Sequence, residues 1–354
     1  MPSKPLLQSV LLLILLSSCA PTIKNFEKYQ KQFFPKTDFM PSKENLEGKA
    51  AKVVIFALDE NGNQVATQAQ LGNSIANNVE NILAKNRLAD LVDRNAATKL
   101  QKEIALAEMN KTGSYKGPQV ADYAVSGTIS NAGFISKYSS GSTYINPKTG
   151  QIISVPPHFT YTSDVSGNLK IYELPSLAVI DAIEFNGKKT RTENVQQKGG
   201  LSLGALQIGG EQVKGVERDD SLVRKAGEDA VEEMTIDIKN SFAKKGYILE
   251  KRIYDEKSIF KITLGSLDGI KHGDKFEIIG QYETENPITN QSEIERRIIG
   301  TGTITDKIDP KTCWAVLDDS KQSDSVRLGD PVKMKYKKSS FASFAKVAKT
   351  MIEQ

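Results

Sequence analysis

The sequence predicts a mixed α/β domain followed by a small all-β barrel. Two patterns carry this prediction. Between residues 51 and 250, apolar runs of strand length alternate with stretches in which apolar residues recur at helical spacing. Between residues 255 and 337, short apolar runs are separated by glycine turns. The 354 residues are enough for two domains of ordinary size.

Residues 1–18 have the pattern of a secretory signal peptide. Lys4 precedes an apolar run over residues 10–16, which is shorter than the roughly 20 residues that a membrane-spanning helix needs. Small residues and a cysteine follow this run. We therefore expect residues 1–18 to be removed from the mature protein.

Leu16-Ser17-Ser18-Cys19 resembles the lipobox of bacterial lipoproteins. The resemblance implies cleavage between Ser18 and Cys19, followed by attachment of diacylglycerol and a fatty acyl chain to Cys19. It also implies the periplasmic face of the outer membrane, because Ala20 stands where an aspartate would favour retention in the inner membrane. The alternative is an ordinary signal peptide in which the cysteine stands by chance.

Residues 19–50 are rich in proline, lysine, asparagine and serine, which is typical of a tether between an anchor and a folded body. Phe26, Tyr29 and Phe33 share one helical face, and Pro35 ends that run. Two interpretations stay open. The segment is either a disordered tether or a short helix that docks on the membrane, on a neighbouring subunit or on its own domain.

The first domain, residues 51–250, begins with a continuous apolar strand at 53–58 that we expect to be buried on both faces. A helix with apolar residues between 71 and 83 follows, then a short strand at 88–92 and a helix capped by Asp93. The remaining expected elements are strands at 122–130, 161–173 and 178–190 and a long helix at 221–245.

Three stretches of this domain together resemble the CsgG family of outer-membrane lipoproteins. They are Ala121-Asp-Tyr-Ala-Val-Ser-Gly-Thr-Ile-Ser130, Gly167-Asn-Leu-Lys-Ile-Tyr-Glu173 and Ala178-Val-Ile-Asp-Ala-Ile-Glu184. The resemblance covers about residues 50–250. It implies a sheet covered by helices, a ring of subunits, and two hairpins from each subunit in a membrane barrel through which protein is exported.

The sequence departs from the family where those hairpins should lie, at residues 131–160 and 191–220. A membrane strand needs about 9 to 11 residues that alternate between apolar and polar. In the first insert only 152–155 and 159–161 can alternate, and in the second the apolar residues are set among glycines. We therefore favour mobile or partner-facing hairpins over a transmembrane barrel.

The second domain, residues 255–337, contains two Gly-Asp turns that lead into strands, in 264–276 and 326–332. The pattern resembles the carboxyl-terminal domain of the flagellar assembly protein FlgT, a periplasmic ring component. It implies a small all-β barrel of the SH3-like kind. Its expected strands are 259–264, 275–279, 298–305, 312–317 and 331–336.

Residues 338–354 form an expected amphipathic basic helix with Phe341, Phe344 and Met351 on its apolar face. Such a helix can lie on anionic headgroups or fill a partner's groove. Packing back on the barrel is the alternative.

Composition excludes several classes of function. The net charge is +4, but residues 331–354 alone contribute +5, so a basic nucleic-acid-binding body is not expected. Two His and two Cys are too few for a zinc cluster or a disulfide framework. Apart from Cys19, the only cysteine is Cys313, which we expect to be a core residue. No nucleotide-binding or hydrolase motif is complete, so no metal, cofactor or catalytic residue is expected.

These observations predict a non-enzymatic, acylated lipoprotein of the outer membrane. We expect it to be a homo-oligomeric structural subunit of a ring-shaped envelope assembly, such as a secretion-system core or a flagellar collar. The alternatives are a CsgG-like export pore and a monomeric periplasmic scaffold or ligand sensor.

Overall fold

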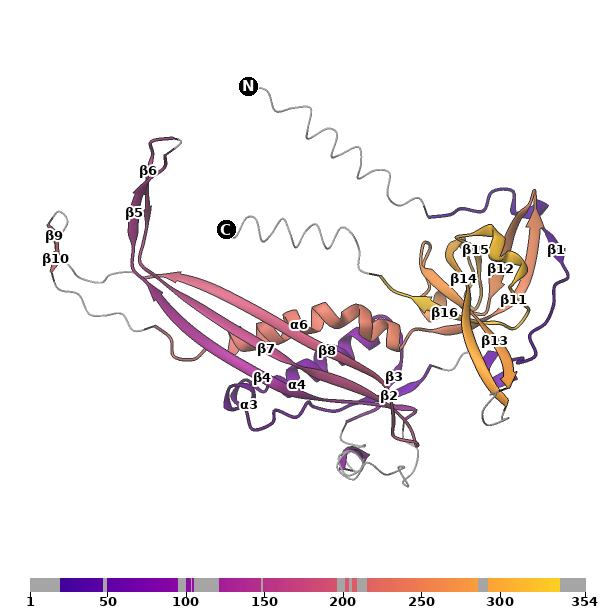
Figure 1. Cartoon of the computed structure of the whole chain (residues 1–354), viewed down its shortest axis with the longest axis horizontal. Coiled ribbons are helices and arrows are strands. Elements are labelled where there is room, and N and C mark those ends of the chain that lie inside the picture. Colours follow the sequence, from indigo (N-terminus) through magenta and orange to yellow (C-terminus); the bar gives the residue numbers. More distant parts are fainter. Residues whose placement is uncertain are drawn as a thin grey trace. The chain divides into compact units, whose positions relative to one another are not determined.

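The computed structural model describes residues 20–46, 50–94, 100–102, 104, 121–147, 149–195, 201–203, 206–208, 215–285 and 292–337 (Figure 1). The chain divides into two compact units, which we describe separately. The sheet unit comprises residues 51–85 and 89–238, and the barrel unit comprises residues 1–50, 86–88 and 239–354.

The sheet unit is built on five strands in the order β3-β2-β4-β7-β8. β2 is parallel to both of its neighbours, whereas β4, β7 and β8 form an antiparallel meander. Two small hairpins, β5–β6 and β9–β10, follow β4 and β8. The strands are β2 (Lys52–Ile55), β3 (Asp90–Leu91), β4 (Tyr123–Ser139), β5 (Ser142–Ile145), β6 (Ile152–Val155), β7 (His158–Glu173), β8 (Ala178–Asn194), β9 (Leu201–Leu203) and β10 (Leu206–Ile208).

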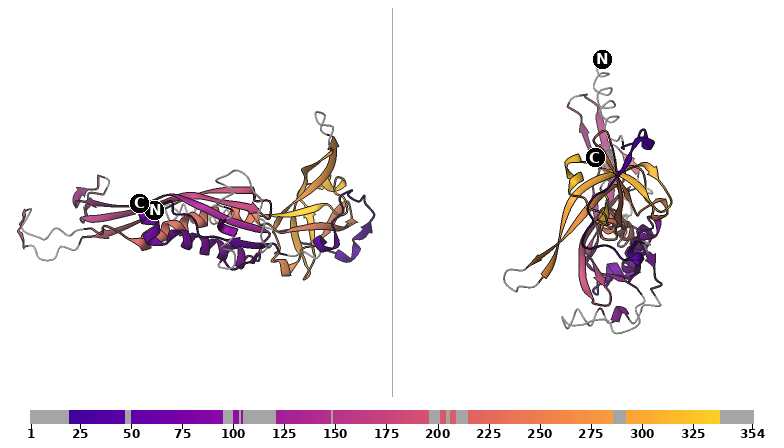
Figure 2. Two further views of the ribbon diagram at one scale, coloured as in Figure 1. Left: turned by 90° about the horizontal axis from the view of Figure 1, so that it is seen from below. Right: turned by 90° about the vertical axis from the view of Figure 1, so that its right-hand side faces the viewer.

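Helices α3 (Gln64–Ala69), α4 (Leu71–Lys85) and α6 (Asp220–Ser241) belong to this unit, and α4 and α6 run along the sheet (Figure 2). α6 lies very close to β8, because a Cβ atom added to Gly187 would lie 2.1 Å from the carbonyl oxygen of Ala226. α6 also contacts α4, because a Cβ atom added to Gly227 would lie 2.6 Å from the Leu71 side chain. Glycines thus permit the close packing of these layers.

The opposite face of the sheet is also covered at one end. Val54 and Phe56 of the β2 segment are fully buried there, together with Leu100 and Ile104, which are helical. The remaining buried members of this cluster are Ala121, Ala124, Tyr172 and Leu174. The expected burial of the first strand on both faces is confirmed.

The meander is longer than the sequence predicted. β4 continues to Ser139 and β7 begins at His158, and the two strands remain paired over this whole length. The expected strands at 122–130 and 161–173 are therefore too short, because both strands continue into the first insert. The polar and aromatic residues of 131–139 pair as strand although they lack a clean apolar alternation.

The barrel unit contains a closed antiparallel barrel of six strands. Closure comes from the pairing of β11 with β16. Its strands are β11 (Lys245–Tyr254), β12 (Lys257–Ile262), β13 (Lys275–Glu285), β14 (Ser292–Ile308), β15 (Cys313–Leu317) and β16 (Pro331–Lys335). Outside the barrel strands lie η1 (Phe26–Lys28), β1 (Gln30–Gln32), α2 (Lys43–Leu46), η3 (Ser266–Asp268) and η4 (Ser320–Asp324).

The core of the barrel is apolar and tightly closed, and Phe260, Phe276 and Ile278 are almost inaccessible to solvent. Cys313 belongs to this core, as expected. A mixed α and β chain with a small closed β-barrel is therefore the observed fold class. Membership of the sheet unit in a CsgG-like family stays a prediction.

The first barrel strand corrects the expected boundary between the long helix and the barrel. We expected the helix to reach residue 245 and the barrel to begin near 255, but α6 ends at Ser241 and β11 occupies 245–254. Lys251 conceals this strand in the sequence, because it is a charged residue at a buried position. Its ammonium group donates to the carbonyl oxygen of Ser323 at 3.2 Å.

Candidate functional site

The residues singled out by sequence lie at the two ends of the chain. Ser18 and Cys19, and likewise Phe341, Phe344 and Met351, lie outside the described residues. The structure does describe the chain that directly follows Cys19. Residues 20–37, which we call the N-terminal strap, pack on the barrel of their own unit.

The strap begins on the loop that leads into β13. The Nε2 atom of His272 donates to the carbonyl oxygen of Pro21 at 3.0 Å, which identifies Nε2 as a protonated nitrogen because a carbonyl can only accept. Gly273, in a left-handed conformation with φ +88°, leaves room beside it for Ala20. The first described residue thus already contacts the barrel.

Ile23 fastens the strap to the outside of the barrel. Its side chain is 6% exposed and packs with Ile259 and Trp314. Its backbone N–H donates to Oδ1 of Asp306 at 2.8 Å. Burial opposes ionisation of Asp306, but hydrogen bonds from Ile23 and Lys307 outweigh it and lower the pKa of the carboxyl.

Aromatic rings and cations extend this contact. Phe26 meets Trp314 edge to face, with ring centroids 5.2 Å apart. The guanidinium of Arg252 lies 5.2 Å from the Phe26 centroid and 4.8 Å from the Trp314 centroid. Glu250 orients Arg252 through a hydrogen bond of 2.6 Å. A strand residue therefore places its cation between one ring from the strap and one from the barrel.

The rest of the strap adds backbone pairing. β1 pairs antiparallel with β11, opposite residues 251–253. Farther along, Leu328 donates to Pro35 at 2.8 Å and accepts from Thr37 at 2.9 Å. The expectation of a free tether is therefore wrong for residues 20–37, which dock on the chain's own domain. The expected helix with Phe26, Tyr29 and Phe33 on one face is also wrong, because only η1 is helical, β1 is extended and Phe33 is 91% exposed.

Sequence reasoning found Phe26 and Tyr29 but missed the partners of the strap. Ile23 lies more than 200 residues before Arg252 and Trp314 in the sequence, and no periodic pattern joins them. An isolated apolar residue between prolines, as Ile23 is, was the available signal.

The strap starts at one end of the barrel, which we call the Ala20 end and which consists of residues 263–274 and 306–312. These two connections pack together, since the backbone N–H groups of Ser266 and Leu267 donate to Asp309 and Pro310 at 3.0 Å each. Leu267 is 61% exposed at this end. Lys271, His272 and Lys311 are exposed there as well.

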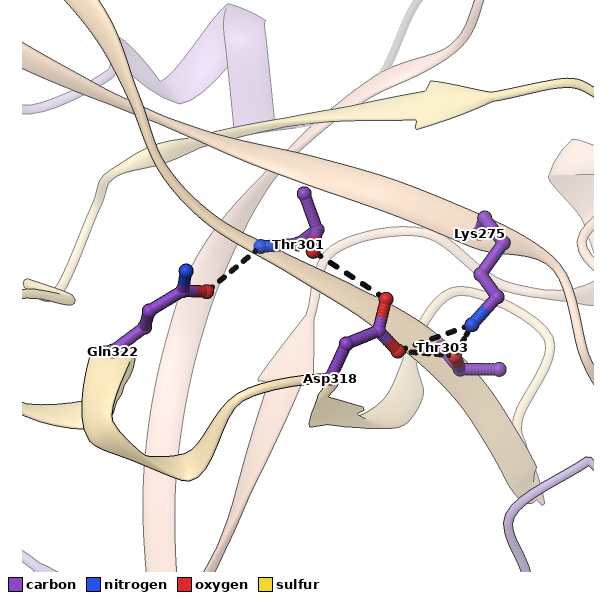
Figure 3. Close-up of polar contacts among 5 residues, drawn as sticks. All are labelled: Lys275, Thr301, Thr303, Asp318 and Gln322. Carbon is purple, nitrogen blue, oxygen red and sulfur yellow. Dashed lines mark hydrogen bonds and ion pairs between the residues drawn. The ribbon is translucent and has the colours of Figure 1, made fainter.

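A polar cluster on the barrel joins β13, β14 and the residue after β15 to η4 (Figure 3). The Asp318 carboxylate accepts from Lys275 of β13 at 3.0 Å and from Thr303 of β14 at 2.9 Å. The Thr301 N–H donates to Gln322 of η4 at 3.2 Å. Burial disfavours the Asp318 anion, but these hydrogen bonds and the Lys275 charge prevail and lower its pKa. Because the polar groups of the cluster form hydrogen bonds with one another, we interpret the cluster as structural.

No protein-family model matches the sequence, and no curated protein matches it either. The CsgG-like and FlgT-like resemblances therefore rest on the quoted motifs alone and remain predictions.

The sheet unit carries an open cavity of about 530 Å³ on the strand face opposite α6, after the end of β2. Asp59, Thr128, Asn168 and Lys170 are among its lining residues. The Oδ1 atom of Asn168 is buried and has no hydrogen-bond partner among the described residues. The cavity is a polar recess whose lining also includes Glu60 and Ser126.

The distal half of the meander carries an aromatic row. Phe134, Tyr161 and Phe159 stack with ring centroids 6.0 Å apart in each successive pair. The chain that returns to α6 covers this row, because the Val216 N–H donates to the Tyr161 hydroxyl at 3.2 Å. Arg191 lies over the Tyr161 ring and pairs with Asp219 at 2.9 Å.

The described part of the chain, residues 20–337 with the gaps given above, holds neither a metal-binding cluster nor a membrane-spanning helix. No three His, Cys, Asp or Glu side chains in that part of the chain gather closely enough to bind a metal ion. None of its helices has the length and hydropathy needed to cross a bilayer. Burial raises the pKa of the Cys313 thiol to about 12, so this cysteine is unreactive in the folded protein.

Proposed function

We propose that the protein is a non-enzymatic lipoprotein of the outer membrane and a structural subunit of a ring-shaped envelope assembly. The observation that carries this proposal is the N-terminal strap. The chain after the lipobox-like cysteine docks at once on the barrel through Pro21 and Ile23. An acyl anchor on Cys19 would therefore hold the barrel next to the membrane, with no flexible tether between them.

The sheet unit supports the assembly part of the proposal. β8 is a 17-residue edge strand that pairs with β7 alone among the described strands. Val179 and Ile180 near its start are 52% and 48% exposed. A long edge strand offers unpaired backbone groups to another chain, which suits repeated contacts between subunits.

The anchor is tested by membrane sedimentation of Cys19→Ala against the wild type. We expect the variant to leave the membrane fraction, because several acyl chains hold a protein far longer than one chain does. Cys313→Ala is the matched control, since it removes the other cysteine and leaves the lipobox-like motif intact. Retention of Cys19→Ala at the wild-type level would contradict the anchor.

The assembly is tested by the mass of the native complex extracted in mild detergent through a tag at residue 354. A large complex with several other proteins would support the machine subunit. A monomer would overturn the ring.

The second candidate is a CsgG-like export pore. It is favoured by the length of β4, β7 and β8, which span 17, 16 and 17 residues. Each exceeds the 9 to 11 residues of a membrane strand. Conductance of the purified protein in planar bilayers tests it, and a homo-oligomer that produces no channels would exclude it.

A further inference from the structure

All six barrel strands begin or end at the Ala20 end of the barrel. β14 ends here at Ile308, opposite Cys313, and β11 starts here, opposite Lys333 of β16, so the chain from α6 also enters the barrel at this end. The end of β12 lies opposite the start of β15, as the pair Ile262–Cys313 shows. The start of β13 lies opposite the end of β16, as the pair Lys275–Lys335 shows. The connections 263–274 and 306–312 therefore close this end of the barrel together.

The chain reaches the barrel at this same end. Pro21 is hydrogen-bonded to His272, and Ala20 lies beside Gly273. Cys19 is only two residues before Pro21, so it can reach no more than about 7 Å from it. The headgroup layer on each side of a bilayer is about 5 to 7 Å thick. Because the strap is bound to the barrel at Pro21, an acylated Cys19 would keep this end of the barrel close to the bilayer.

The surface of the Ala20 end suits a lipid interface. Leu267 projects an apolar side chain that is 61% exposed. Lys271 and Lys311 are exposed on the two connections that form this end. Four acids, Asp268, Asp274, Asp306 and Asp309, lie on the same two segments as Lys271, Lys307 and Lys311, so this end carries no excess of positive charge. What suits this end to a lipid interface is therefore the exposed apolar side chain of Leu267, which can lie at the level of the headgroups, and not its charge.

The chain also leaves the barrel here. β16 ends at Lys335, opposite Lys275, and the Tyr336 N–H donates to Asn240 at 2.8 Å. The described chain therefore ends at this end of the barrel, at Lys337.

We propose that the Ala20 end is the membrane-facing surface of the barrel and lies against the lipid headgroups of the bilayer that holds Cys19. The inference rests on the proposed acylation of Cys19 and adds an orientation to it. The opposite end of the barrel, with the β11–β12 turn at 255–256, then faces away from the lipid.

Two single cysteine variants at opposite ends of the barrel test the orientation. Lys311→Cys lies at the Ala20 end, and Lys257→Cys lies at the β11–β12 turn; both positions are exposed. Leu267→Cys is a second probe of the Ala20 end. Each variant is extracted in its acylated form, labelled with a thiol-reactive fluorophore and placed in phosphatidylethanolamine–phosphatidylglycerol vesicles that contain a headgroup-nitroxide lipid. Cys313 is buried and does not compete for the label.

We expect the nitroxide lipid to quench the labels at 311 and 267 at least twofold more than the label at 257. Equal quenching at both ends, or stronger quenching at 257, would overturn the orientation. Mass spectrometry of the amino-terminal peptide separates the two proposals. An unmodified Cys19 would overturn the lipoprotein itself, whereas an acylated Cys19 with equal quenching would overturn the orientation alone.

Discussion

The barrel and the five-stranded sheet differ in how they complete their edges. In the barrel, β11 and β16 pair and close the sheet on itself. β11 is longer than this pairing, and β1 of the strap takes the place beside residues 251–253 that β16 leaves. In the sheet, by contrast, β8 has one partner among the described strands over its 17 residues.

This difference indicates separate roles for the two units. A closed barrel offers other molecules its side chains, whereas an open edge also offers backbone donors and acceptors. The barrel is therefore suited to a fixed position, and the sheet to contacts between chains.

The largest expected effect is at the contact between α6 and β8. Gly187→Ala would place a Cβ atom 2.1 Å from the Ala226 oxygen and 2.6 Å from the Ala230 nitrogen, so helix and strand must separate. We expect the free energy of unfolding to fall by about 3 kcal/mol, measured by urea titration with circular dichroism.

Gly300→Ala in the barrel is the matched control. The nearest atom to its added Cβ, Oε1 of Gln322, is 3.5 Å away, which is an ordinary contact. We expect a change within about 0.5 kcal/mol. Similar urea midpoints for the two variants would show that α6 does not press on β8 at Gly187.

The next effect concerns the strap. Ile23→Ala removes the side chain that packs on Ile259 and Trp314, and we expect the barrel to lose about 2 kcal/mol. Trp314 is the single tryptophan, so its fluorescence during urea unfolding reports on this contact directly. Phe33→Ala is the control within the strap, because Phe33 is 91% exposed and should contribute little. Equal midpoints for both variants would mean that the strap is not part of the folded barrel.

The apolar runs of the sequence predicted most of the fold. The spacing of apolar residues in the sequence matches the positions that are buried in three elements. They are the strand segment Val53–Leu58, the helix from Leu71 and the long helix from Asp220. β11 was missed because Lys251 breaks its apolar pattern, although the buried lysine is satisfied by Ser323. A pattern of hydrophobic residues cannot anticipate a partner that is 72 residues away.

The candidate site was harder to predict for the same reason. The lipobox-like motif is local and was visible, but the docking of the strap depends on contacts between residues 20–37 and residues beyond 250. Pro21, Ile23 and Phe26 look like parts of a polar tether until His272 and Trp314 are placed beside them. The distal meander was underestimated because its strands are held by backbone pairing and a covered aromatic row.

The smallest effect is electrostatic and compares two carboxylates of the barrel. Asp318 has a pKa lowered below 3.8, so its contribution to stability is present above that value and is lost as the pH falls through the lowered pKa. Burial raises the pKa of Asp330 above 3.8, so its contribution is present at low pH and is lost as the pH rises through the raised pKa. The Asp318 side chain is 43% exposed, so solvent screens it and the effect should be below about 1 kcal/mol.

Asp318→Asn and Asp330→Asn should therefore change the pH dependence of unfolding in opposite directions. Between pH 6 and pH 3, the advantage of the wild type over Asp318→Asn should shrink, because the protonated carboxyl no longer attracts Lys275. Over the same range, the wild type should gain relative to Asp330→Asn, because protonation relieves the buried charge. Urea midpoints measured at each pH give both slopes. If the two slopes have the same sign, burial does not distinguish these carboxylates, and the cluster around Asp318 holds the barrel through shape and neutral hydrogen bonds instead.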